Sequence, residues 1–160
     1  MEKDTTKIKI GVLVEKNNKL LLIKELNSSN GKYYWNIIKG TFESTRDKDF
    51  FKTAKRECKE EAGIEIKLIR LINVIYLNKK YRRVIQFNFI ALIKKGIPRL
   101  LSKKQHKIKN EDIIEIKFFT KNEIKKIKKS EFIDIRAFLT VRDWLGDGKK
   151  GLEIFKFINQ

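Results

Sequence analysis

The stretch that decides the fold reads "KRECKEEAGI" and runs from Lys55 to Ile64. It carries glutamates at positions 57, 60 and 61. On a helix, with about 100° between neighbours, these carboxylates share about 100° of arc over one turn. Exposed carboxylates this close repel one another weakly, whereas Mg²⁺ and Mn²⁺ prefer such oxygen ligands. The stretch is therefore either a solvated helix face or a divalent-metal site.

The flanking residues predict that this stretch closes a helix over residues 47–62. Ser44 or Asp47 is suited to cap the first turn, and Gly63 follows the last turn, where a left-handed residue is common. Small or apolar residues recur every four positions at Phe50, Ala54, Cys58 and Ala62. This side of the helix is expected to face the core.

Strand patterns surround the predicted helix. Residues 7–14 alternate with a period of two, "EKNNK" supplies turn residues and "LLLI" starts a second strand at Leu20, so we expect a hairpin. The aromatic segment "YYWNIIKG" is expected to be extended, and further strands are expected over residues 64–77, 84–93 and 113–119.

Two helices are expected after the last of these strands. Thr120 and Glu123 form a capping box for a short Lys-rich helix, and a longer amphipathic helix is expected from Ser130 through Trp144. This order of elements predicts an α/β protein with a mixed sheet that helices cover on two sides.

The chain has 160 residues and a formal net charge of +18, which fits one domain with an unusually basic surface. Such a charge attracts polyanions such as nucleotides or RNA. The excess of Lys and Ile is also what the codon bias of an A/T-rich genome produces, and surface Lys is well tolerated.

Cysteine and histidine are too scarce for several classes of site. Cys58 and His106 are the sole residues of their types, which excludes an internal disulfide and a thiolate zinc cluster and disfavours a Ser-His-Asp triad. The N-terminus is charged where a signal peptide is apolar, and no apolar run approaches about 18 residues. We expect a soluble, cytoplasmic protein with no membrane partner.

The quoted stretch resembles the end of the Nudix hydrolase box, G-x5-E-x7-R-E-U-x-E-E-x-G-U, where U is aliphatic. "RECKEEAGI" matches its last nine positions from Arg56 onward, with Cys58 at the first U, and "KGTFE" is similar to its opening at Gly40. The box would cover residues 40–64. The resemblance implies a Nudix-type α/β/α sandwich with a mixed β-sheet, in a single domain over residues 1–160.

The chain departs from the family pattern in three places. Gly40 and Arg56 are sixteen positions apart instead of fourteen, so two residues are inserted in "STRDKD". Lys48 occupies the place of the first box glutamate, with Asp47 or Asp49 as candidate substitutes. The segment "YYWNIIKG" resembles the "W-x-x-P-K-G" of members that act on dinucleoside polyphosphates and capped RNA, but carries Ile38 in place of the proline.

The resemblance implies a metal-dependent pyrophosphohydrolase, which acts on acid anhydrides in phosphorus-containing substrates. The substrate would be a phosphorylated nucleotide, a dinucleoside polyphosphate or an RNA 5′ end. Mg²⁺ (or Mn²⁺) would be held by the carbonyl of Gly40 and by Glu57, Glu60 and Glu61, which are also the expected catalytic residues. Arg56 would orient a glutamate.

Other roles stay open. Lys39 is either a phosphate contact or a solvated side chain beside a loop. The general base is either a box glutamate or an acid from a later loop, for which Glu111, Asp112 and Glu115 are the candidates.

The alternative from another class is an inactive Nudix-fold module that binds nucleic acid or a protein partner. Lys48 and the insertion favour it, whereas the complete R-E-x-x-E-E argues against it, because three mutually repelling carboxylates serve no purpose without a metal. The Lys-rich segments 103–109 and 121–129 favour RNA if they lie beside the site. The sequence names neither the substrate nor the oligomeric state.

Overall fold

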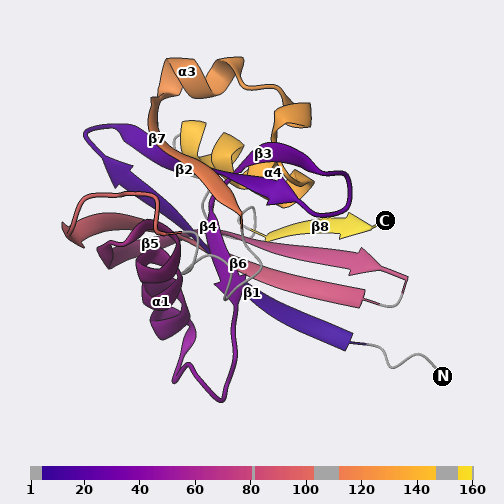
Figure 1. The fold of residues 1–160 in the computed structure, drawn as a ribbon. Helices are drawn as coiled ribbons and strands as arrows, with labels where there is room; N and C mark the ends of the chain where they lie inside the picture. Colours follow the sequence, from indigo (N-terminus) through magenta and orange to yellow (C-terminus); the bar gives the residue numbers. More distant parts are fainter. Residues whose placement is uncertain (1–4, 81, 103–111, 147–154, 160) are drawn as a thin grey trace.

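The computed structural model describes residues 5–80, 82–102, 112–146 and 155–159. Within them, eight strands form one mixed sheet in the order β3-β2-β1-β6-β5-β8, with β4 paired to β1 and β7 to β2 (Figure 1). The strands are β1 (Thr5–Lys16), β2 (Lys19–Asn27), β3 (Lys32–Asn36), β4 (Ile38–Thr41), β5 (Glu65–Lys79), β6 (Arg82–Lys95), β7 (Ile113–Thr120) and β8 (Phe155–Asn159).

The predicted hairpin is present, and a parallel pair makes the sheet mixed. β1 and β2 run antiparallel from the pair of Glu15 and Leu20. Asn17 and Asn18 connect them with φ angles of 50° and 56°, which suit a two-residue hairpin turn because asparagine tolerates the left-handed region. β1 also pairs in parallel with β6.

Helices cover both sides of the sheet, as predicted. In the described residues these are α1 (Phe50–Ala62), α3 (Lys121–Lys126) and α4 (Ile135–Leu145), with a short 3₁₀ turn, η1 (Lys129–Glu131). α1 lies on one face and α4 on the other (Figure 1). None of these helices is both long enough and apolar enough to cross a bilayer.

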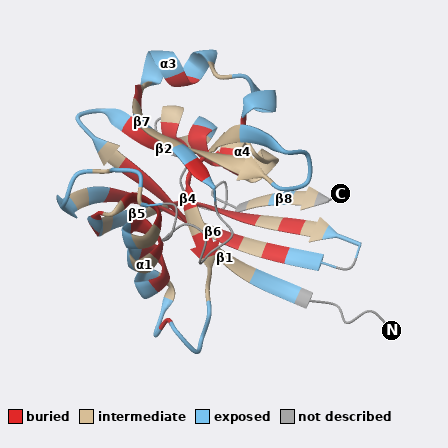
Figure 2. Ribbon diagram, in the orientation of Figure 1, coloured by how far each residue is buried: buried red, intermediate tan, exposed pale blue. Residues whose placement is uncertain are grey.

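The core has two layers, one under each of these helices. Neighbouring residues of a strand point to opposite faces, and Val12 packs in the layer with Ala54 and Cys58 of α1, whereas Leu13 packs in the layer with Val141 and Trp144 of α4. Figure 2 shows the buried residues where the helices meet the strands. The sheet therefore separates an α1 layer from an α4 layer.

Two predicted helix starts were wrong, and each true start has an aspartate cap. α1 begins at Phe50, where Asp49 accepts a hydrogen bond from the Lys52 amide at 2.8 Å, so neither Ser44 nor Asp47 caps it. α4 begins at Ile135 and is capped by Asp134. Ser130 lies in η1 instead.

Other predicted signals hold. The residue after α1, Gly63, has a φ of 68° and closes the helix in the left-handed region. The side chains of Thr120 and Glu123 form the expected capping box of α3. β8 was not expected from the sequence.

Candidate functional site

The last two turns of α1 place the glutamates beside β4. Glu57 and Glu61 are 3% and 1% exposed, whereas the Glu60 side chain is 28% exposed. Glu57 packs against Gly40 so closely that a Cβ atom at position 40 would overlap its carboxyl group. Because only glycine leaves that space, the chain needs Gly40 for the approach of β4 to α1.

Arg56 joins three carboxylates from two segments. Its Nε and Nη2 atoms donate to the two oxygens of Asp47 at 2.8 and 2.7 Å. Its Nη1 atom donates to Glu57 and, at 3.2 Å, to Glu60. The flat guanidinium suits such paired contacts. Arg56 therefore fixes Glu57 and Glu60 relative to the loop before α1, and its orienting role in catalysis stays a prediction.

Asp47 is the acid that pairs with Arg56. Its side chain is buried and accepts a further hydrogen bond from the Thr53 hydroxyl at 3.0 Å. The hydrogen bonds from Arg56 hold the pKa of Asp47 at about 2, and the bond from Thr53 adds to the effect. Asp49 caps α1 and Lys48 is exposed. Despite the two-residue insertion, Arg56 therefore still has a carboxylate partner, Asp47.

Glu60 also contacts the inserted loop. Arg46 Nη2 donates to its Oε1 atom at 3.2 Å, and Arg46 also lies 3.7 Å from Glu43. Both side chains of the Arg46–Glu43 pair are about half exposed, so this pair stabilises the loop only weakly. Glu60 thus lies between the guanidinium groups of Arg46 and Arg56.

The donor chemistry of this site fits a hard divalent ion, although the carboxylates contact guanidinium groups here. Across the described ranges, no group of three acidic, cysteine or histidine side chains converges as a ready-made metal site. Buried carboxylates and a backbone carbonyl at Gly40 are nonetheless the oxygen ligands that Mg²⁺ and Mn²⁺ take. The metal role of these residues remains a prediction.

Lys39 points to the N-terminus of α4. Its side chain is 15% exposed and its Nζ atom lies 3.4 Å from Asp134 Oδ2. The same carboxylate accepts a hydrogen bond from Arg136, and its other oxygen accepts one from the Ala137 amide at 2.9 Å. Lys39 is therefore not a solvated side chain beside a loop, and its contact with a phosphate stays a prediction.

Three basic side chains gather at this point: Lys9, Lys39 and Arg136, here called the cationic cluster. Burial lowers the pKa of Lys9, and the charges of Lys39 and Arg136 lower it further, while Glu57 opposes them. Lys9 therefore places the cationic cluster within electrostatic range of Glu57. Arg136 is largely buried, and its Nε and Nη1 atoms have no hydrogen-bond partner.

Two carboxylates accompany the cationic cluster. Burial on its own would raise the pKa of Asp134, but Lys39 and Arg136 hold it well below the usual range. Burial raises the pKa of Glu25, against the opposing charge of Lys39 and a hydrogen bond from Asn36 at 2.8 Å. Lys9, Glu25 and Arg136 were missed by sequence reasoning, since β1, β2 and α4 bring them together from distant parts of the chain.

The role of general base stays a prediction for each of its candidates. Asp112 is exposed and accepts a hydrogen bond from the Tyr33 hydroxyl at 2.8 Å. Glu115 lies half-buried in β7, opposite Lys24. Glu111 and the Lys-rich segment 103–109 lie outside the described residues. Trp35 packs edge-to-face on Phe119, with ring centroids 4.8 Å apart, and lies against the α4 layer of the core.

Comparisons with known proteins agree with this fold. A family model described as "NUDIX domain" matches residues 5–139. A NUDIX hydrolase structure from Nitrosomonas europaea has a TM-score of 0.73 at 18% identity, covering 94% of this chain and 95% of that one. A MutT NUDIX hydrolase from Burkholderia pseudomallei has 0.63 at 15%, covering 87% and 98%.

Another similar structure carries a substrate in its name. An ADP-ribose pyrophosphatase from Streptococcus suis has a TM-score of 0.60 at 16% identity, covering 96% of this chain and 99% of that one. At such identities the structural likeness shows the fold alone. No curated protein matches the sequence.

Proposed function

The chain belongs to the Nudix hydrolase family, and from this premise we propose that it is a metal-dependent pyrophosphohydrolase that cleaves a diphosphate linkage in a nucleoside diphosphate derivative. The observation that carries the proposal is the network around Arg56, which holds Asp47, Glu57 and Glu60 in fixed relation beside Gly40. Burying several carboxylates together is costly unless positive charges compensate them. In this proposal Arg56 compensates part of the negative charge, and a bound divalent cation compensates the rest.

Glu57, Glu60 and Glu61, with the carbonyl of Gly40, would hold Mg²⁺ or Mn²⁺. When bound, the ion offsets the negative charge of the diphosphate and lowers the pKa of an attacking water. Asp47 keeps the guanidinium of Arg56 in place through its paired hydrogen bonds, and Arg56 in turn would orient Glu57 and Glu60 for the ion. Arg56 is thus a positioning residue in this proposal.

The cationic cluster would receive the phosphate chain of the substrate. Lys9, Lys39 and Arg136 face two carboxylates, Glu25 and Asp134, so the positive charges exceed the negative ones by one. Arg136 has two buried donor atoms without partners, which is costly unless an acceptor arrives. A phosphate oxygen is such an acceptor, and Lys39 keeps the substrate-binding role expected for it.

The choice of nucleotide follows from names of similar structures rather than from this site. Neighbours are titled "ADP-ribose pyrophosphatase" and "UDP-X diphosphatase", so nucleoside diphosphate derivatives come first. The inactive-module alternative loses support, because Asp47 pairs with Arg56 despite Lys48 and the insertion. RNA rests on the net charge, the Lys-rich segments and the likeness of "YYWNIIKG" to members that act on capped RNA, and it ranks below small nucleotides.

The test is a hydrolysis assay with Mg²⁺ or Mn²⁺ on a substrate panel. The panel holds nucleoside triphosphates, ADP-ribose, nucleotide sugars, dinucleoside polyphosphates and 5′-triphosphorylated RNA. Glu61→Gln is run beside wild type, with Glu65→Gln at an exposed position of β5 as the matched control. We expect turnover that is lost in Glu61→Gln and kept in Glu65→Gln. Folded wild-type protein that turns over no substrate with either metal would overturn the proposal.

A further inference from the structure

A groove of about 520 Å³ lies between α1 and β5. Residues 66–71 of β5 line one wall, Phe51 and Lys55 of α1 the other, and Phe89 and Lys94 of β6 complete it. At about 100° per residue, Glu57 and Glu60 lie at least about 120° around α1 from Phe51 and Glu61 about 80° from it, and none of these three glutamates lines the groove. The groove is therefore separate from the candidate active site.

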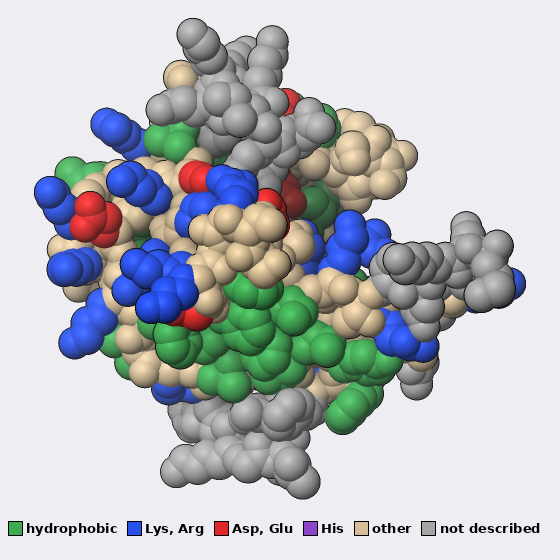
Figure 3. Space-filling view, turned by 90° about the horizontal axis from the view of Figure 1, so that it is seen from below, with side chains coloured by type: hydrophobic (Ala, Val, Ile, Leu, Met, Phe, Trp, Pro, Cys, Tyr) green, Lys and Arg blue, Asp and Glu red, His purple; other side chains and the backbone are tan. Residues whose placement is uncertain are grey.

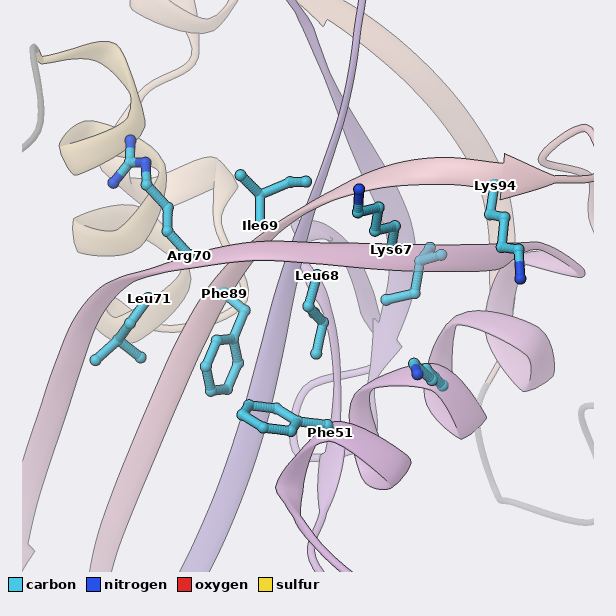
Figure 4. Close-up of a pocket in the computed structure, with 10 residues that line it drawn as sticks. Phe51, Lys67, Leu68, Ile69, Arg70, Leu71, Phe89 and Lys94 are labelled. Atoms are coloured by element: carbon cyan, nitrogen blue, oxygen red, sulfur yellow. The ribbon is translucent and has the colours of Figure 1, made fainter.

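The groove follows the edge of β5. Figure 4 shows Leu68 and Phe89 directed toward Phe51 and Leu71 on the same side of the strand, whereas Ile69 and Arg70 leave the strand on the other side. Side chains from both faces of a strand can line one groove only along the strand edge. Among the described strands, β8 covers that edge only from Val74 to Asn78, so residues 65–73 present it to the groove.

The lining combines exposed apolar side chains with positive charge. Phe51 is 55% and Ile69 48% exposed, and the Phe51 ring stands edge-on to Phe89 at 5.7 Å between centroids. All the ionisable residues that line the groove are basic: Lys55, Lys67, Arg70 and Lys94. Figure 3 shows, from below, a broad hydrophobic area with Lys and Arg side chains along part of its border.

These features rule against two occupants. A second copy of the chain would bring another net charge of +18 toward a basic lining, which repels it. A regular added strand is disfavoured, since register shifts between Leu68 and Arg70 and between Leu71 and Asn73 interrupt the edge. Recognition must therefore come from side chains of an anionic partner.

We propose that this groove docks an acidic segment of a partner protein, with interspersed apolar side chains. The apolar side chains would pack between Phe51 and Leu68, and the carboxylates would meet the basic residues of the lining. The aliphatic wall favours a polypeptide over nucleic acid, which stacks on several exposed rings, whereas Phe51 alone of the lining aromatics is exposed. The proposal does not depend on hydrolase activity.

The test measures binding of labelled peptides by fluorescence anisotropy at physiological salt. The probe is a short peptide of alternating Glu and Leu, compared with a peptide in which Ser replaces each Leu and with a single-stranded RNA of equal charge. The variants are Phe51→Ala and the double change Lys55→Glu with Arg70→Glu. The matched control reverses two exposed charges on α3, Lys125→Glu with Lys126→Glu.

We expect the Glu/Leu peptide to bind, and Phe51→Ala to weaken it by about tenfold or more. The groove double variant should lose binding and the α3 variant should keep it, while hydrolysis is unchanged in all three. Amide chemical shifts should move at residues 51, 55 and 66–71, which keeps the test decisive if the double variant does not fold. The proposal would be overturned if the Glu/Ser peptide bound as tightly as the Glu/Leu peptide, or if the Glu/Leu peptide did not bind at all. It would also be overturned if the RNA bound more tightly than the Glu/Leu peptide and displaced it.

Discussion

Replacing Asp47 by asparagine keeps the shape of the side chain and removes the charge that Arg56 binds. The pKa of Asp47 falls from 3.8 to about 2 in the folded protein, which corresponds to about 2 kcal/mol at neutral pH. Because Arg56 keeps some contact with solvent, we expect Asp47→Asn to lower the free energy of unfolding by about 1–2 kcal/mol. In thermal melts this is a drop of about 2–8 °C.

The pH dependence separates this effect from a change of packing. A carboxyl group whose pKa is depressed by folding stabilises the protein above its unfolded pKa, and the stabilisation is lost as the pH falls through the folded pKa. The difference between wild type and Asp47→Asn should be complete at pH 6 and fall to about half near pH 3. Urea unfolding at several pH values between 7 and 3 measures it.

The control is Asp49→Asn, because asparagine caps a helix about as well as aspartate. Asp49 caps α1, whereas the guanidinium of Arg56 donates to Asp47. This variant should stay within about 0.5 kcal/mol of wild type. The reasoning is refuted if Asp47→Asn unfolds at the same urea concentration as wild type, or if its deficit is the same at pH 3 as at pH 7.

Further predictions concern the same site. Arg56→Lys cannot reproduce the paired contacts with Asp47, so it should lower the free energy of unfolding by about 1–3 kcal/mol and also lower kcat. Unchanged stability in urea would show that the Arg56 network does not stabilise the fold. Gly40→Ala would push a methyl group into the Glu57 carboxyl, so it should lower kcat and reduce the free energy of unfolding by about 1–3 kcal/mol. Unaltered kinetics would show that Glu57 can move aside without loss of activity. Burial raises the pKa of the Cys58 thiol, so iodoacetamide should label it only after unfolding, and mass spectrometry of native protein would reveal any exception.

Local signals in the sequence predicted the parts of the fold that local chemistry decides. The turn at Asn17 and Asn18 and the left-handed Gly63 depend on backbone preferences of the residues themselves. The spacing of Ala54, Cys58 and Ala62 depends on helix geometry alone. These features need no knowledge of distant contacts, so they could be read in advance.

Features decided by distant contacts could not be predicted in this way. Asp47 was a predicted N-cap, but its side chain pairs with Arg56, nine positions along the chain, and Asp49 caps α1 instead. β8 has a short apolar pattern and is placed by its pairing with β5. Arg136 joins Lys39 only because α4 packs across the sheet, and no local pattern marks it.

The pairing of Asp47 with Arg56 bears on how distant relatives of this chain are to be recognised. The loop from β4 to α1 is two residues longer than the family pattern allows, yet a carboxylate still reaches the guanidinium. In this chain the two charges meet in space although the loop between β4 and α1 differs in length from the family pattern. A search pattern with a rigid gap would pass over this chain. One that allows the acid to come from any position of the loop would find it.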